Sequence, residues 1–202
     1  IPATIDNDIG CSHYTIGFDS ACNTAIECID KLRDTMQSHE RCSVVEVMGR
    51  HAGYLALYVG ISVGATAVLI PEREPDFEKD IVEKIRRARL AGTTHYMVVV
   101  AEGAGSAIEI SQRIHDELGI DPRVTVLGHI QRGGSPTARD RETASRMGYE
   151  AVKVLAEGAG NQIIGIQNGL LTDIEMEEAL AMTKPFQMDR YQILEALTNS
   201  CG

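Results

Sequence analysis

The chain has 202 residues, of which 44% are hydrophobic and 24% charged, and its formal net charge is −10. This composition is typical of a globular protein with an aliphatic core, and the length fits one large domain or two small ones. The negative charge argues against nucleic acid as a partner, because backbone phosphates bind to basic surfaces, and no apolar run reaches the roughly 18 residues of a membrane span.

The first ten residues, IPATIDNDIG, place Asp6 and Asp8 two residues apart, just after Pro2 and Thr4. In an extended segment such carboxylates point to the same side and repel, so a cation is expected beside them. The alternative is a solvated turn, the usual structure of loops rich in Asp and Asn. These residues alone leave open the choice between that turn and a site where one carboxylate handles a proton and the other a metal ion.

Alternating strand-length and helical patterns follow along the chain. Continuous aliphatic runs predict strands at 43–48, 65–70, 95–101, 123–128 and 162–167. Apolar residues at spacings of three and four predict helices over 20–36, 53–63, 77–90, 106–118, 138–157 and 174–182. Because the strand runs are continuous rather than alternating, both faces of the sheet are expected to be covered. The sequence therefore predicts an α/β protein with a parallel, doubly wound sheet.

In doubly wound sheets, ligands bind beyond the carboxyl ends of the strands. The segments at these places are MGRHAG (48–53), PERE (71–74), EGAGS (102–106) and GHIQRGGSP (128–136). Three of the four combine glycine with a charged side chain, so backbone can approach a ligand closely while the side chain neutralises it.

Several charged residues at these ends are candidates for binding. Four arginines flank strands or sit in glycine-rich turns: Arg41, Arg50, Arg123 and Arg132. Their guanidinium groups either bind phosphate oxygens in bidentate fashion or form surface ion pairs. His129 is either a hydrogen-bonded histidine at a strand end or a phosphate donor beside Arg132. Glu102 either accepts hydrogen bonds from sugar hydroxyls or is a helix-capping or solvated residue.

Other common sites have weak support or none. EGAGSA (102–107) lacks the third glycine of GxGxxG, no GxxxxGK[ST] loop occurs, and no His-x-x-x-His pair indicates a zinc hydrolase. The five cysteines form no CxxC pair; they are Cys11, Cys22, Cys28, Cys42 and Cys201. This pattern favours reduced thiols over disulfides or zinc. With no signal-peptide pattern either, we expect a cytoplasmic protein.

Together, these stretches resemble the bacterial-type, ATP-dependent 6-phosphofructokinase family. The motifs that stand in this family's order are ATIDND (3–8), TIGFDSA (15–21), RCSVVEVMGRHAG (41–53), VLGHIQRGGSP (126–136), SRMG (145–148) and GIQN (165–168). The resemblance covers essentially the whole chain, and it implies that the chain is the C-terminal two-thirds of a subunit. The N-terminal third, with most of the ATP-binding loops, would then be absent.

The resemblance also implies a phosphofructokinase-like fold of two doubly wound, Rossmann-like parallel-sheet domains, the first one incomplete. Residues 1–17 and 131–181 would be the remnant of the ATP-binding domain. Residues 18–130 and 182–202 would form the sugar-phosphate-binding domain.

By the same resemblance, the enzyme phosphorylates fructose 6-phosphate at its 1-hydroxyl with ATP and Mg²⁺, giving fructose 1,6-bisphosphate and ADP in glycolysis. Asp6 would be the general base, Asp8 would hold Mg²⁺, Thr4 would help position the reacting groups, and Arg50 would stabilise the transferring phosphoryl group. Contacts to the sugar phosphate in the same subunit would come from Thr4, Met48, Gly49, Glu102, His129 and Arg132. Arg41 and Arg123 would reach it from a neighbouring subunit, which implies a homo-oligomer, in this family a homotetramer.

The phosphoryl donor is the next choice. Pyrophosphate-dependent relatives usually carry Lys where Ala3 stands, and a small residue leaves room for a nucleotide, so we expect ATP and keep pyrophosphate as the alternative. A catalytically silent regulatory or assembly half is the non-enzymatic alternative, against which the intact TIDND argues. An NAD-dependent oxidoreductase is a remote one. The 202-residue piece by itself is expected to be inactive.

One stretch departs from the family pattern. Allosteric bacterial members hold an effector nucleotide with a lysine-rich turn and an acidic residue. Here LAGTTH (90–95) has no lysine, Thr66 stands at the acidic position, and Arg33 is the remaining effector-site match. We therefore expect weak or absent control by ADP and phosphoenolpyruvate.

Overall fold

The structure, a computed structural model, describes residues 1–36 and 41–199. Four strands form a parallel sheet in the order β2-β3-β1-β4. They are β1 (Arg41–Val47), β2 (Ala67–Leu69), β3 (His95–Ala101) and β4 (Arg123–Val126). All four lie where the sequence predicts strands, so the parallel α/β sheet is confirmed.

Helices cover both faces of this sheet, as the continuous aliphatic runs predict. They are α1 (Phe18–Met36), α2 (Tyr54–Ser62), the π-helical turn η1 (Glu78–Val82), α3 (Glu83–Leu90), α4 (Ala107–Leu118) and α7 (Met188–Asn199). Successive residues of β1 face opposite cores. Val45 packs with Leu55 of α2, on the side that α1 and α7 share, whereas Val44 belongs to a core with Ile85 of α3 and Ile114 of α4. The sheet is therefore doubly wound.

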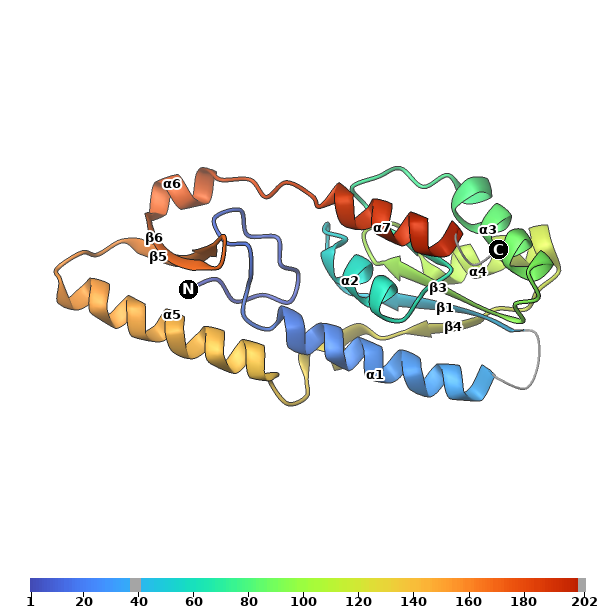
Figure 1. Cartoon of the computed structure of the whole chain (residues 1–202), viewed down its shortest axis with the longest axis horizontal. Helices are drawn as coiled ribbons and strands as arrows, with labels where there is room; N and C mark the ends of the chain where they lie inside the picture. The colour runs from blue at the N-terminus through green and yellow to red at the C-terminus, as the bar shows by residue number, and fades with distance from the viewer. Residues whose placement is uncertain (37–40, 200–202) are drawn as a thin grey trace.

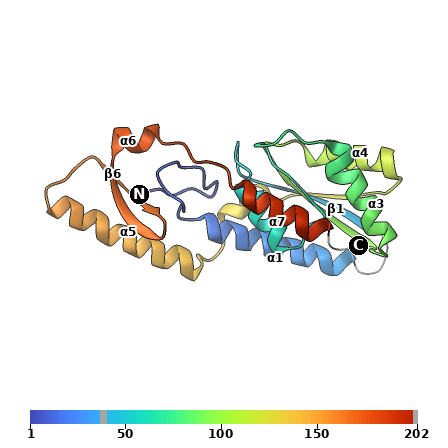
Figure 2. The same ribbon diagram turned by 45° about the horizontal axis from the view of Figure 1, so that its top comes forward.

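The other end of the molecule holds α5 (Ala138–Ala156), β5 (Gln162–Gln167), β6 (Leu170–Glu175) and α6 (Met176–Ala181). Figure 1 shows these elements beside the N-terminus, at the opposite end from the four-stranded sheet, and the turned view in Figure 2 shows the same separation. The predicted strand 162–167 is confirmed, but the expectation that it joins a parallel sheet is wrong. β5 pairs antiparallel with β6, which the sequence analysis missed. The reason is the Asn168–Gly169 turn, where both φ angles are positive, as a tight hairpin requires.

A buried carboxylate joins the two ends. Asp140, at the start of α5, is 2% exposed. It accepts hydrogen bonds from the Tyr14 hydroxyl (2.5 Å), the Gly17 amide (2.8 Å), the Ser20 amide (2.9 Å) and the Ser20 hydroxyl. Burial by itself would raise the pKa of Asp140, but these hydrogen bonds outweigh it and hold the pKa below its ordinary value. Asp140 thus fixes α5 against the start of α1.

The cysteines that the structure describes are free thiols: Cys11, Cys22, Cys28 and Cys42. Burial raises the pKa of Cys42 to about 12, so it stays protonated. Cys201 lies outside the described residues. None of the helices within the described ranges is long and apolar enough to cross a bilayer.

Candidate functional site

The TIDND segment (4–8) turns instead of running extended. Asn7 adopts φ 54°, a left-handed conformation that Asn tolerates well. As a result Asp6 is buried, at 8% exposure, while Asp8 faces solvent. The expectation of an extended segment is therefore wrong, and a fully solvated turn is wrong as well, because Asp6 lies inside the protein.

Asp6 sits in a site that disfavours its charge. Burial raises the pKa of Asp6 above its ordinary value, and the nearby charge of Asp8 raises it further. Hydrogen bonding from Thr4 and the positive charge of Arg132 act in the opposite direction. Thr4, Asp6 and Arg132 line one cavity of about 330 Å³, so the fold brings the first loop and GHIQRGGSP together. A carboxylate with a raised proton affinity thus faces a space that also holds an anion-binding guanidinium.

The segments that follow β1 and β3 are hydrogen-bonded to each other beside this cavity. One oxygen of Glu102 accepts hydrogen bonds from the amides of Gly49 (3.2 Å) and Arg50 (2.7 Å). Arg50 adopts φ 55°, a conformation that costs energy for a residue other than glycine and is found mainly at functional sites. A side chain at Gly103 would place its Cβ 2.2 Å from the Arg50 carbonyl oxygen. Glu102 therefore holds the arginine-bearing loop in place.

This role replaces the helix-capping alternative for Glu102. The first amide of α4, that of Ala107, donates instead to a carboxylate oxygen of Glu46, at 2.9 Å. The sequence analysis did not single out Glu46, which lies inside a strand.

A short 3-10 helix, η2 (Gly128–Arg132), carries the next candidates. Within it Gln131 is 1% exposed, and its side-chain oxygen accepts a hydrogen bond from the Met48 amide at 2.8 Å. This bond docks η2 against the end of β1, while the side chains of His129 and Arg132 remain exposed. Met48 is buried beside them. Sequence reasoning missed Gln131, which it treated only as part of a motif.

The structure does not bring Arg41 and Arg123 to this place. They are the first residues of β1 and β4, at the opposite edge of the sheet from Met48. Arg41 lies six residues before Val47, so at about 3.3 Å per residue roughly 20 Å separate it from the carboxyl end of β1. Arg41, Arg89 and Arg123 line a separate cavity of about 240 Å³. Their contribution to a neighbouring subunit stays a prediction.

The effector-site match lies in a third place. Arg33, Thr66, Thr93 and His95 all line a cavity of about 500 Å³, so these stretches do converge. However, the Arg33 guanidinium donates a hydrogen bond to the Val63 carbonyl. The family-like residues therefore line one cavity, and Arg33 uses one of its hydrogen-bond donors within the protein.

Lys184 is a further residue that sequence reasoning missed. Its ammonium donates to the Asn7 side-chain oxygen (2.9 Å) and to the His13 carbonyl (3.2 Å). Burial lowers the pKa of Lys184 to about 8, although the nearby charge of Asp8 opposes this shift. Lys184 thus supports the residue that separates the two aspartates.

Fold and site together define an α/β protein with a carboxylate- and arginine-bearing site at the carboxyl edge of a doubly wound sheet. Residues 1–155 match a family model described as phosphofructokinase, and the chain belongs to this family.

Known relatives agree with this assignment. The chain is 52% identical over 198 residues to the ATP-dependent 6-phosphofructokinase of Bacillus cytotoxicus and 50% identical to that of Brevibacillus brevis. Each match covers 98% of this chain and 62% of the relative, so the chain spans less than two-thirds of their length.

Solved structures agree in fold. The phosphofructokinase from Saccharomyces cerevisiae superposes with a TM-score of 0.84 at 32% identity, covering 98% of this chain and 27% of that one. A pyrophosphate-dependent phosphofructokinase from Marinobacter aquaeolei gives 0.79 at 22% identity, with 98% and 59% covered, which supports the fold alone. The predicted phosphofructokinase-like α/β fold is confirmed.

Proposed function

We propose that this chain is part of an ATP-dependent 6-phosphofructokinase, which transfers the γ-phosphoryl group of ATP to the 1-hydroxyl of fructose 6-phosphate. The observation that carries the proposal is the cavity shared by Thr4, Asp6 and Arg132. It combines a proton acceptor and a cation at the carboxyl edge of the sheet, where α/β proteins bind ligands. The relatives named ATP-dependent 6-phosphofructokinase support the choice of reaction.

In this proposal Asp6 takes the proton of the sugar's 1-hydroxyl as that oxygen attacks phosphorus. The raised pKa of Asp6 suits the role, because a general base works best when its pKa lies near the pH at which the enzyme works. Arg132 and His129, both on η2, bind the phosphate group of the sugar. Arg50, held by Glu102, stabilises charge on the transferring phosphoryl group, since phosphoryl transfer depends on positioning and charge neutralisation.

Asp8 is the residue that would hold Mg²⁺. Its exposed carboxylate is a hard oxygen donor, and Mg²⁺ commonly binds one or two carboxylates while nucleotide phosphates and water complete its shell. No group of three or more His, Cys, Asp or Glu residues that could bind a metal occurs among the described residues. When bound, the metal neutralises phosphate charge. The repulsion between Asp8 and Asp6 also indicates that a cation is favoured here.

The domain organisation and assembly belong to the same proposal. Residues 1–17 and 131–181 form the remnant of the ATP-binding domain, and 18–130 with 182–202 form the sugar-phosphate domain. Arg41 and Arg123, far from their own subunit's site, serve the site of a neighbour in a homotetramer. Free buried thiols such as Cys42 are typical of the reducing cytoplasm, where we place the enzyme.

The choice of ATP as phosphoryl donor rests on Ala3, which lines the same cavity as Asp6. Its small side chain leaves space that a lysine would fill. The test uses the completed chain, defined as this chain fused behind the part of the Bacillus cytotoxicus relative that it leaves unmatched. We expect phosphorylation of fructose 6-phosphate with ATP, little with pyrophosphate, and loss of ATP use in Ala3→Lys. A preference of the unsubstituted completed chain for pyrophosphate would refute the assignment of ATP as donor. Inactivity with both donors would refute the proposed activity.

A further inference from the structure

One segment near the C-terminus passes close to the loop that carries the two aspartates. Residues 182–187 run between α6 and α7, and Figure 1 shows them crossing from the α5 end of the molecule to the four-stranded sheet. We call these residues the crossing segment. A Cβ added at Gly10 would lie only 2.1 Å from the Met182 carbonyl oxygen, so the two backbones are in direct contact.

Lys184 is the charged side chain of the crossing segment. Its ammonium donates to the Asn7 side-chain oxygen at 2.9 Å and to the His13 carbonyl oxygen at 3.2 Å. It also lies 5.2 Å from the centre of the Tyr54 ring, within the range of a cation–π contact. One ammonium group therefore contacts the aspartate-bearing loop on one side and α2 on the other.

Asn7 receives hydrogen bonds from two parts of the chain. Besides that of Lys184, its side-chain oxygen accepts a hydrogen bond from the Thr15 amide at 3.1 Å. Both partners can only donate, so the Asn7 atom that faces them is the oxygen. A residue other than glycine keeps a positive φ, here 54°, where its surroundings hold it. Thr15 and Lys184 are the groups that hold Asn7, which in turn sets the direction of Asp6.

Tyr54 extends this network toward the arginine-bearing loop. It is buried and is the first residue of α2, directly after the segment 48–53 that contains Arg50. The Tyr54 hydroxyl donates to the Pro185 carbonyl oxygen at 3.2 Å, and its ring packs against Phe186 with the ring centres 5.2 Å apart. The crossing segment thus contacts both the loop of Asp6 and the element that follows the loop of Arg50.

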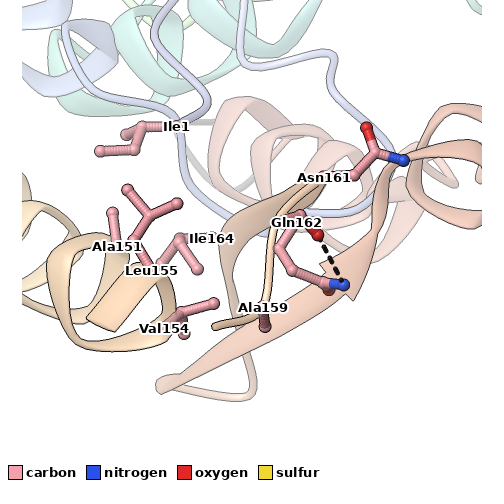
Figure 3. Close-up of a pocket in the computed structure, with 9 residues that line it drawn as sticks. Ile1, Ala151, Val154, Leu155, Ala159, Asn161, Gln162 and Ile164 are labelled. Carbon is pink, nitrogen blue, oxygen red and sulfur yellow. Dashed lines mark hydrogen bonds between the residues drawn. The ribbon is translucent and has the colours of Figure 1, made fainter. Parts of the chain in front are cut away.

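The other end of the first loop has a different kind of contact. Ile1 lines a cavity of about 130 Å³ together with Ala151, Val154 and Leu155 of α5, as Figure 3 shows. Apolar packing is non-directional, so it keeps the start of the chain beside α5 without fixing how Asp6 points. Hydrogen bonds depend on angle as well as distance, and Lys184 supplies them at Asn7.

We propose that Lys184 is a positioning residue for phosphoryl transfer: through Asn7, its ammonium holds Asp6 at a fixed place relative to the loop of Arg50. This inference rests on the function proposed above for Asp6 and Arg50. Lys184 acts through Asn7. Such an indirect role can have a large effect, because a displacement of the reacting groups by about 1 Å can lower the rate by about 10²-fold.

Steady-state kinetics of the completed chain are the first test. Lys184→Met keeps an unbranched side chain but removes its charge and its donors, and Lys79→Met, an exposed change on η1, is the matched control. We expect Lys184→Met to lower kcat by about tenfold or more, with the KM for fructose 6-phosphate within about threefold of the parent value. The control should match the parent. A raised KM at unchanged kcat would overturn the proposal.

A double-mutant cycle tests whether Lys184 acts through Asn7. Asn7→Gly removes the side-chain acceptor, and glycine adopts the same positive φ without strain. In this background Lys184→Met should lower kcat by less than about threefold, because residues that act through each other are not additive. If Lys184→Met lowers kcat by the same factor in both backgrounds, Lys184 does not act through Asn7.

Hydrogen exchange of the 202-residue chain is the second test and requires no activity. In Lys184→Met, the amides of residues 4–10 should exchange faster by about tenfold or more, while those of β3 stay within about twofold of the parent. Unchanged exchange of residues 4–10, or an equal rise in β3, would overturn the proposal. Inactivity of the unsubstituted completed chain would instead refute the proposed function, so the two failures are distinguishable.

Discussion

Replacement of Asp140 by alanine should cost this chain a large part of its stability. The change leaves four donors without their acceptor, two of them the rigid backbone amides of Gly17 and Ser20. A buried donor without a partner costs about 1–3 kcal/mol, so the two amides together cost roughly 2–6 kcal/mol. The Tyr14 and Ser20 hydroxyls can rotate toward other acceptors and add less. Because a whole domain is stable by only about 5–15 kcal/mol, the effect is easily measured.

Urea unfolding followed by circular dichroism gives the comparison. We expect Asp140→Ala to lower the free energy of unfolding by that amount and Tyr14→Phe, which removes one donor, by about 1 kcal/mol. The pKa of Asp140 is lower folded than unfolded, so its contribution is present above the unfolded pKa and disappears as pH falls through the folded one. The difference in the free energy of unfolding between Asp140→Asn and the parent chain should therefore become smaller below about pH 4. A loss under about 1 kcal/mol in Asp140→Ala would refute this reasoning.

Three further outcomes are expected. Gly103→Ala forces a Cβ against the Arg50 carbonyl, so we expect the free energy of unfolding in urea to fall by about 1–3 kcal/mol. In the completed chain the KM for fructose 6-phosphate should rise. Parent-like values of both quantities would show that the contact relaxes freely. The pKa of Asp6 is raised in the folded state, so the stability that its protonated carboxyl contributes is lost as pH rises through the folded pKa. Asp6→Asn should therefore resist urea better than the parent chain at pH 7 and equally well below about pH 4. A variant less stable than the parent at pH 7 would contradict the direction of this pKa shift. Saturation curves of the completed chain should move little with ADP or phosphoenolpyruvate, and a marked shift with either would contradict the reading of Arg33.

Much of the fold could be predicted because the signals were local. The strand at 95–101 is a continuous aliphatic run, and β3 occupies the same residues. The hairpin was harder, since β6 is partly exposed and its sequence, LLTDIE, has no clear period. The Asn168–Gly169 turn was the signal that could have revealed it. The helix α7 escaped for a similar reason, because its apolar residues do not concentrate on one face.

The site divides in the same way. Motifs located Asp6, Arg50, Glu102 and Arg132, and the strand-end rule explains why such distant segments meet. Sequence could not show which side chains support them. Gln131 lies 83 residues from Met48, and Lys184 lies 177 residues from Asn7, so each of these hydrogen bonds exists only after the chain has folded. Nor could it show that Asn7 turns the two aspartates to different environments.

The role of Asp6 as general base is the central claim, and Asp6→Ser in the completed chain tests it most directly. Asp173→Ser, an exposed change on β6, is the matched control. We expect kcat with ATP and fructose 6-phosphate to fall by roughly 10²–10⁴-fold in Asp6→Ser, with the KM for the sugar phosphate little changed, and to stay near the parent value in the control. A kcat for Asp6→Ser close to that of the parent would contradict the account.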